Sequence, residues 1–159
     1  MRKLNYSGEK MALFIMLVGI PGSGKSTLAE TLAQKYQAAV ISTDQLRYLI
    51  TGNEADQSKD NLVFAAAHQK IREMLMDDHN IIYDATNITP KDRKRILNLL
   101  PAGTVKKCYY KKIGLRTALI RNAHRKRVVP EKIISKMYNH LQPPVLAEGW
   151  DEIQVIEEP

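Results

Sequence analysis

The 159-residue sequence predicts an α/β domain with a mostly parallel central sheet of about five strands. Short apolar runs alternate along the chain with segments whose apolar residues recur at helical spacing, and this alternation is typical of parallel sheets. The composition is ordinary for a globular domain, with 44% hydrophobic and 26% charged residues. A chain of this length can bury one full core, so we expect a single domain over residues 11–159, preceded by a polar extension over residues 1–10.

Five short runs are the expected strands. The first, LFIMLV at residues 13–18, leads straight into a glycine-rich loop without a small-residue cleavage site, which favours a buried strand over a signal peptide. The other strands are expected at residues 38–41, 80–87, 104–112 and 152–156.

Helical spacing predicts the segments between these strands, over residues 26–36, 43–50, 63–75, 89–100, 115–127 and 130–141. Thr43 or Asp44 is the candidate N-cap of the second helix. Thr89 is the expected N-cap of the fourth, with Pro90 at its first position. A polar loop is expected over residues 51–60.

The strongest motif is VGIPGSGKST at residues 18–27. It fits the pattern Gly-x-x-x-x-Gly-Lys-Ser/Thr, follows an apolar run and opens a helix, as a phosphate-binding loop must. Backbone N–H groups in such a loop surround nucleotide phosphates, and the helix N-terminus favours the anion. We expect Lys25 to reach the β/γ-phosphates and Ser26 to ligate Mg²⁺. The residues expected to bind ATP in this phosphate loop are Gly22, Ser23, Gly24, Lys25, Ser26 and Thr27.

Polar residues also follow the second and third expected strands, and ligands of parallel sheets bind at the carboxyl ends of strands. Asp84 is the candidate to hold Mg²⁺ through water, with an Asx-type turn as the alternative. Asp44 and Arg47 share a helical face, so a carboxylate could take a proton from an attacking hydroxyl while an arginine holds an acceptor phosphate. The alternatives are an N-cap for Asp44 and a surface ion pair between the two.

The net charge of +7 is concentrated between residues 91 and 137, where fifteen Lys and Arg face two acids. Such a block indicates a polyanionic partner or a solvated basic face. Arg121 and Arg125, at i and i+4, are expected on one face of a helix in a lid over residues 114–130. Arg121 would contact ATP and Arg125 would offset charge during transfer. His124, Lys126 and Arg127 are assigned to the basic face or to nucleic-acid contacts.

The order of four segments carries a resemblance over residues 14–141: GIPGSGKST, ISTDQLR, IIYDATNITPKDR and RNAHRKRVVPEKIISKMYNHL. The chain resembles the kinase domain of the polynucleotide 5′-hydroxyl kinases and their small bacterial and phage relatives. The resemblance implies a P-loop NTPase three-layer sandwich with a helical lid. It also implies ATP and Mg²⁺, Asp44 as general base, Arg47 on the acceptor's 3′-phosphate, and Asp84 as an acid near the metal.

The implied activity is transfer of the ATP γ-phosphate to a hydroxyl, with the 5′-hydroxyl end of single-stranded RNA or DNA as the leading acceptor. A nucleoside, a small metabolite or an aminoacyl-tRNA is the alternative acceptor, and a regulatory ATPase is the alternative class. The sequence has no phosphatase or ligase motif, which favours a stand-alone kinase. One cysteine, Cys108, excludes an internal disulfide and is read as a buried thiol. No apolar stretch reaches membrane-spanning length, and a cytoplasmic location is expected.

Overall fold

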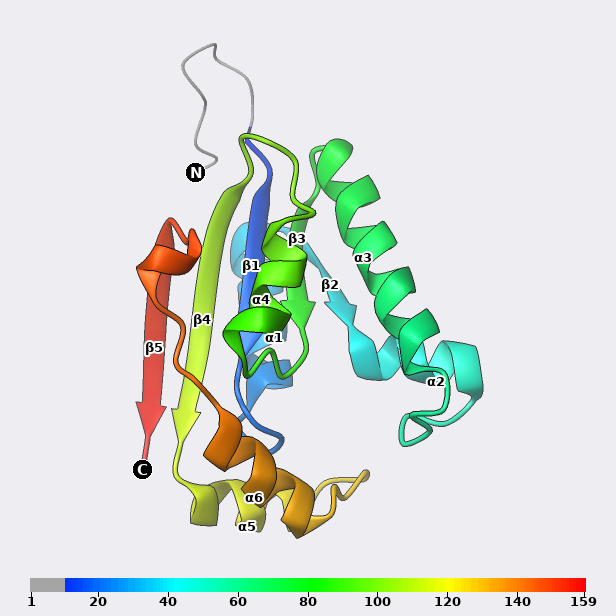
Figure 1. The fold of residues 1–159 in the computed structure, drawn as a ribbon, viewed down its shortest axis with the longest axis vertical. Helices are drawn as coiled ribbons and strands as arrows, with labels where there is room; N and C mark the ends of the chain where they lie inside the picture. The colour runs from blue at the N-terminus through cyan, green and yellow to red at the C-terminus, as the bar shows by residue number, and fades with distance from the viewer. Residues whose placement is uncertain (1–10) are drawn as a thin grey trace.

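The computed structural model describes residues 11–159, so the predicted polar extension over residues 1–10 lies outside the described part. Five strands form one sheet in the order β2-β3-β1-β4-β5, and every neighbouring pair is parallel (Figure 1). The strands are β1 Leu13–Val18, β2 Ala38–Ser42, β3 Asn80–Asp84, β4 Val105–Ile113 and β5 Glu152–Glu158. The predicted parallel five-stranded sheet is confirmed.

Six α-helices connect the strands: α1 Lys25–Tyr36, α2 Thr43–Thr51, α3 Asp60–Met76, α4 Pro90–Leu97, α5 Leu115–Ala123 and α6 Glu131–His140. A 3₁₀ turn, Leu146–Glu148, precedes β5. Within residues 11–159, no helix combines the length and the apolar character that a membrane crossing requires.

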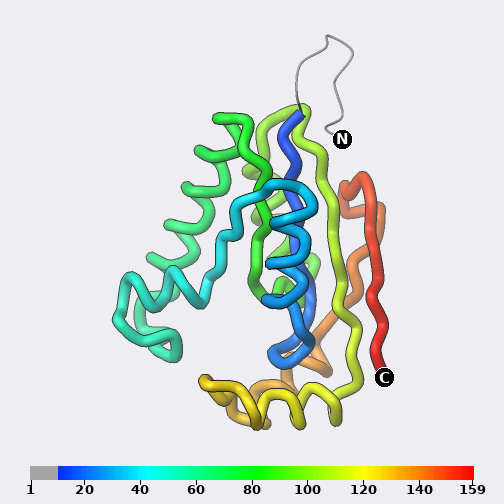
Figure 2. The backbone as a smooth tube through the Cα atoms, turned by 180° about the vertical axis from the view of Figure 1, so that it is seen from behind, coloured from blue at the N-terminus to red at the C-terminus, as the bar shows by residue number. Residues whose placement is uncertain are grey.

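Helices cover both faces of the sheet, because the side chains of β1 alternate between two cores. Phe14 and Met16 share a core with Ile71 of α3 and Ile96 of α4. On the other face, Ile15 and Leu17 pack with Ala29 and Leu32 of α1, which lies in front of the sheet in Figure 2. The predicted three layers are therefore present. Cys108 is fully buried in the first core, where burial raises the pKa of its thiol to about 12.

Two helix starts test the cap predictions. Thr89 caps α4 by accepting a hydrogen bond from the Asp92 N–H at 3.2 Å, with Pro90 at the first position, as predicted. The cap of α2 is Ser42 rather than Thr43 or Asp44: its hydroxyl accepts from the Gln45 N–H at 3.3 Å. Ser42 ends β2 in an extended conformation, which is the geometry that an N-cap needs. The carboxylate of Asp44 is therefore not used as a helix cap.

The helix over residues 115–127 was predicted too long, because α5 ends at Ala123. Asn122 is buried and exchanges two hydrogen bonds with the backbone of Val129, at 2.8 and 3.0 Å. These bonds turn the chain back on itself. Arg125 consequently lies in the loop of residues 124–130, the α5–α6 loop, and not on one helical face with Arg121.

A buried ion pair joins α4 to the turn before β5. Arg93 is fully buried and donates to both carboxylate oxygens of Glu148, at 2.8 and 2.7 Å. Its third hydrogen bond goes to the Asn87 carbonyl oxygen at 3.0 Å, and the Asn87 amide donates to the Leu17 carbonyl oxygen at 2.8 Å. These contacts link the C-terminal part of the chain to the end of β1.

Candidate active site

The carboxyl ends of the strands point toward α5 and α6 (Figure 1). A cavity of about 1090 Å³ opens there. Its walls include the phosphate loop, Asp44 after β2 and the segment after β3, which meet as predicted. The cavity is positively charged, since six cationic side chains and four carboxylates line it. They are Lys25, Arg47, Arg95, Arg121, Arg125 and Arg127, and Asp44, Asp60, Asp84 and Asp92.

The phosphate loop needs glycine at two positions. Gly22 and Gly24 have φ values of 84° and 89°, in the left-handed region. A Cβ on Gly22 would lie 2.5 Å from the Ala118 carbonyl oxygen, so no larger residue fits. Ser26 and Thr27 also line the cavity. Ser23 does not line the cavity: its side chain is fully buried, and its backbone N–H donates to the Ile20 carbonyl oxygen at 3.2 Å. Its contact with ATP stays a prediction.

Lys25 lies under the loop, where its ammonium donates to the Ile20 carbonyl oxygen at 3.0 Å. Burial and the charge of Arg125, opposed by Asp84 and Asp44, together lower the pKa of Lys25 to about 8. These four charged groups are therefore close enough to interact. The predicted nearness of Arg125 to the phosphate site holds, although the helix prediction behind it was wrong.

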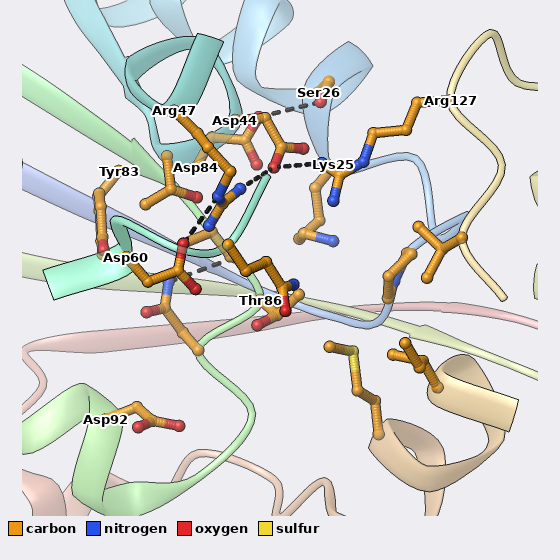
Figure 3. Close-up of a pocket in the computed structure, with 18 of the residues that line it drawn as sticks. Lys25, Ser26, Asp44, Arg47, Asp60, Tyr83, Asp84, Thr86, Asp92 and Arg127 are labelled. Carbon is orange, nitrogen blue, oxygen red and sulfur yellow. Dashed lines mark hydrogen bonds and ion pairs between the residues drawn. The ribbon is translucent and has the colours of Figure 1, made fainter. Parts of the chain in front are cut away.

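Ser26 and Asp84 form the candidate magnesium site. The Ser26 hydroxyl donates to Asp84 Oδ2 at 3.0 Å, joining the phosphate loop to the end of β3 (Figure 3). Burial raises the pKa of Asp84, and the nearby Lys25 and the Ser26 hydrogen bond partly offset this effect. A hydroxyl beside a carboxylate is the hard oxygen donor set that Mg²⁺ prefers, and it usually keeps several waters. The residues present thus fit the metal.

Arg47 is a buried link between two carboxylates, not half of a surface ion pair. Its side chain is 7% exposed; NH1 donates to Asp44 Oδ1 and Nε to Asp60 Oδ1, each at 2.9 Å. Asp60 is the first residue of α3. The sequence analysis assigned Asp60 only to the polar loop over residues 51–60. The one feature of the sequence that could have pointed to Asp60 is that an acid stands at the start of a helix. The guanidinium plane of Arg47 is held at the cavity wall by these two bonds (Figure 3).

Arg127 lines the cavity and does not lie on a solvated basic face, while its predicted nucleic-acid contact stays a prediction. Its NH1 donates to Asp44 Oδ1 at 2.8 Å, across 83 residues of sequence. The contact brings the α5–α6 loop over the cavity and toward α2 (Figure 3). Asp44 thus receives two arginines on one carboxylate oxygen, while its side chain remains 43% exposed.

Arg121 lines the cavity but pairs with the C-terminal strand. Its NH2 donates to Glu158 Oε2 at 2.5 Å, and Lys111 donates to Glu158 Oε1 at 2.6 Å. Hydrogen bonds from Lys111 and Arg121 lower the pKa of Glu158 to about 2, so it is ionised throughout the neutral range. An ATP contact by Arg121 stays a prediction.

Comparisons with known proteins agree with this architecture. The chain is 25% identical over 150 residues to an L-seryl-tRNA(Sec) kinase of Methanococcus maripaludis, covering 87% of this chain and 56% of that relative. A chain in a Pnkp1/Rnl/Hen1 RNA repair complex superposes with a TM-score of 0.77 at 18% identity, over 87% of this chain and 47% of that one. A gluconokinase from Sinorhizobium meliloti 1021 gives 0.62 at 18% identity, over 93% and 83%.

The sheet order, the phosphate loop and the acids at the strand ends define a P-loop, kinase-like α/β domain. Residues 14–144 match the AAA domain family over most of the chain, and the protein belongs to that family. Membership implies nucleotide binding with a metal ion. The chain spans only about half the length of the seryl-tRNA kinase and of the chain in the RNA repair complex.

Proposed function

We propose that the protein is an ATP-dependent kinase that transfers the γ-phosphate to the 5′-hydroxyl of RNA or DNA. The observation that carries the proposal is Asp44. It is a half-exposed carboxylate in the same cavity as the phosphate loop. Arg47 beside it supports an acceptor that carries a phosphate, which an arginine can bind.

The chemistry follows from the two oxygens of Asp44. Oδ1 accepts both arginine hydrogen bonds, so we assign Oδ2 to the acceptor. The acceptor hydroxyl passes its proton to Oδ2 as its oxygen bonds the γ-phosphorus. The bond from the γ-phosphorus to the β,γ-bridging oxygen breaks, and ADP leaves with that electron pair.

Two cations offset the charge that develops on the transferred group. Lys25 lies directly under the loop, and Arg125 is near enough to affect its titration. Ser26 and Asp84 would hold Mg²⁺, which neutralises phosphate charge when bound. We assign Arg47 to the acceptor's 3′-phosphate, because two carboxylates already hold its guanidinium at the cavity wall.

A second acceptor is favoured by one comparison. The relative from Methanococcus maripaludis is an L-seryl-tRNA(Sec) kinase. The hydroxyl of an aminoacyl group on tRNA would use the same Asp44 and the same phosphate loop, and the basic surface suits any RNA. The two proposals share their chemistry and differ only in the acceptor.

The test is to offer γ-labelled ATP to a panel of acceptors: 5′-hydroxyl RNA and DNA oligonucleotides, nucleosides, seryl-tRNA and water. We expect labelled 5′-phosphorylated oligonucleotide as the main product. Label on seryl-tRNA alone would establish the second acceptor, and label released only as inorganic phosphate would overturn the kinase assignment. Lys25→Ala is the control, since it deletes the charge at the β/γ-phosphates and should abolish every labelled product.

A further inference from the structure

The cavity continues past the phosphate loop, along a wall built from α3 and α4. Four of its lining residues lie at helical spacing on α3, and three lie on one side of α4. They are Asn61, Phe64, Ala65 and His68 of α3, and Asp92, Arg95 and Ile96 of α4. We call them the α3–α4 wall. Phosphate transfer from ATP to a hydroxyl beside Asp44 requires none of them.

The α3–α4 wall is continuous with the assigned acceptor site. Asp60 begins α3 and is bonded to Arg47, which we place on the acceptor's 3′-phosphate. Phe64 follows Asp60 by one helical turn, and His68 follows by two turns, about 12 Å along the helix axis. The wall thus offers a path to a strand that leaves Arg47 in its 3′ direction.

The chemistry of the wall suits a nucleotide. Phe64 is 39% exposed and lines the cavity, and aromatic rings are the usual platforms on which bases of single strands stack. Arg95 is exposed on α4 beside the cavity, where it can bind a phosphate. Burial and the charge of Arg95 lower the pKa of His68, so α3 and α4 bring these two side chains near each other. The acid of this wall, Asp92, accepts the Thr89 hydroxyl at 2.7 Å.

We propose that the α3–α4 wall is a subsite for the second nucleotide of a 5′-hydroxyl oligonucleotide: Phe64 stacks on its base and Arg95 binds the phosphate that follows it. The inference rests on the proposed function and specifies its substrate, an acceptor of at least two nucleotides. The positive charge of the cavity and its volume of about 1090 Å³ support a strand over a small metabolite.

The test compares kcat/KM for a nucleoside 3′-monophosphate and for a dinucleotide with a 3′-phosphate. The wild-type protein should prefer the dinucleotide. Phe64→Ala should reduce that preference by between about 5-fold and 150-fold, the range found when a stacking aromatic is removed. Arg95→Gln should also reduce it. The matched controls are Leu62→Ala and Lys94→Gln, exposed neighbours on the same helices that do not line the cavity, and they should keep the wild-type preference.

A binding measurement separates this inference from the reaction. A fluorescent dinucleotide that lacks the 5′-oxygen cannot be phosphorylated, and its dissociation constant should rise in Phe64→Ala and recover in Phe64→Tyr, which keeps an aromatic ring. Equal kcat/KM for both acceptors in the wild type, or equal losses on both in Phe64→Ala, would overturn the subsite alone. Phosphorylation of neither acceptor, with ATP consumed on another member of the panel, would overturn the proposed function and the subsite together.

Discussion

Asp44 is the residue on which the assignment of the reaction depends. Its side chain is free of the capping role, because Ser42 caps α2, and its oxygen Oδ1 accepts from Arg47 and Arg127. These bonds hold the carboxylate in one orientation. A base that is held in place loses less freedom when the acceptor binds, which is the advantage of a positioned group in proton transfer.

Asp44→Asn should therefore slow transfer while leaving the fold in place. The amide is nearly isosteric but cannot take the acceptor's proton, so transfer should fall by roughly 10²- to 10⁴-fold. Arg47 keeps its bond to Asp60, which limits the loss of stability. Transfer rate, ATP affinity and thermal midpoint should be measured on the same protein, with Asp56→Asn in the exposed loop as the control. Transfer at the wild-type rate would show that Asp44 only anchors the two arginines.

Lys25 makes ATP binding depend on pH. Its pKa in the free protein is about 8, below the ordinary 10.5, because burial disfavours the ammonium form. The positive charge is therefore lost as the pH rises through about 8, and ATP affinity should fall over the same interval. Titration calorimetry from about pH 7 to about pH 9.5 would measure this. Lys25→Met, which has no charge to lose, is the matched control and should show a flatter profile.

The lowered pKa of Lys25 also affects the stability of the free protein, which should rise with pH where ATP affinity falls. Between about pH 8 and pH 10.5 the unfolded chain binds more protons at Lys25 than the folded chain does. The contribution of Lys25 to the free energy of unfolding therefore rises with pH across this window. An ATP affinity that stayed constant through pH 8 in the wild type would mean that the ammonium is not the group that meets the phosphates.

Among the elements, the α5–α6 loop depends on contacts made outside itself. Asn122 fixes its ends by bonding Val129, and Arg127 fixes its middle by bonding Asp44 on α2. Short connections with few buried apolar contacts open at low free energy. The middle of the loop is thus held over the cavity by one ion pair, made on the Asp44 oxygen that the acceptor does not use.

Arg127→Gln should loosen this loop. The variant loses the ion pair between residue 127 and Asp44. Amide hydrogen exchange over residues 124–130 should therefore become faster, while exchange in the sheet stays the same. Lys126→Gln is the control, since Lys126 is exposed, does not line the cavity and removes the same charge from the same loop. Equal exchange rates in the two variants would mean that the hydrogen bonds between the Asn122 side chain and the Val129 backbone suffice to hold the loop.

The predictions from sequence succeeded where the cause is local. Apolar runs and helical spacing located the strands and helices, and the glycine pattern located the phosphate loop, because both follow from the chain's own periodicity and torsion angles. The end of α5 was wrong because Asn122 bonds a residue beyond the helix. Asp60 and Arg127 were missed for the same reason: their partners lie 13 and 83 residues away, and spacing along one helix does not report such pairs.

At the scale of the molecule, the Arg93–Glu148 pair joins α4 to the turn before β5. Glu148→Gln would leave a fully buried guanidinium without its charge partner, and breaking such a pair costs about 3–5 kcal/mol. Urea unfolding should show this loss in the free energy of unfolding. The control is Glu157→Gln, whose partner Lys112 is exposed, and it should cost at most about 1 kcal/mol. Equal, small losses would mean that water reaches Arg93.

The sheet order also has a consequence during synthesis. Of the strands in the described residues, β1 is made before the other four, yet it lies at the centre of the sheet, between β3 and β4. Until residues 105–113 leave the ribosome, β1 has an open edge, and its apolar side chains have only part of their final cover. An open edge of this kind pairs readily with another chain. A nascent chain paused before β4 should therefore be the form of this protein most prone to aggregate and most dependent on chaperones.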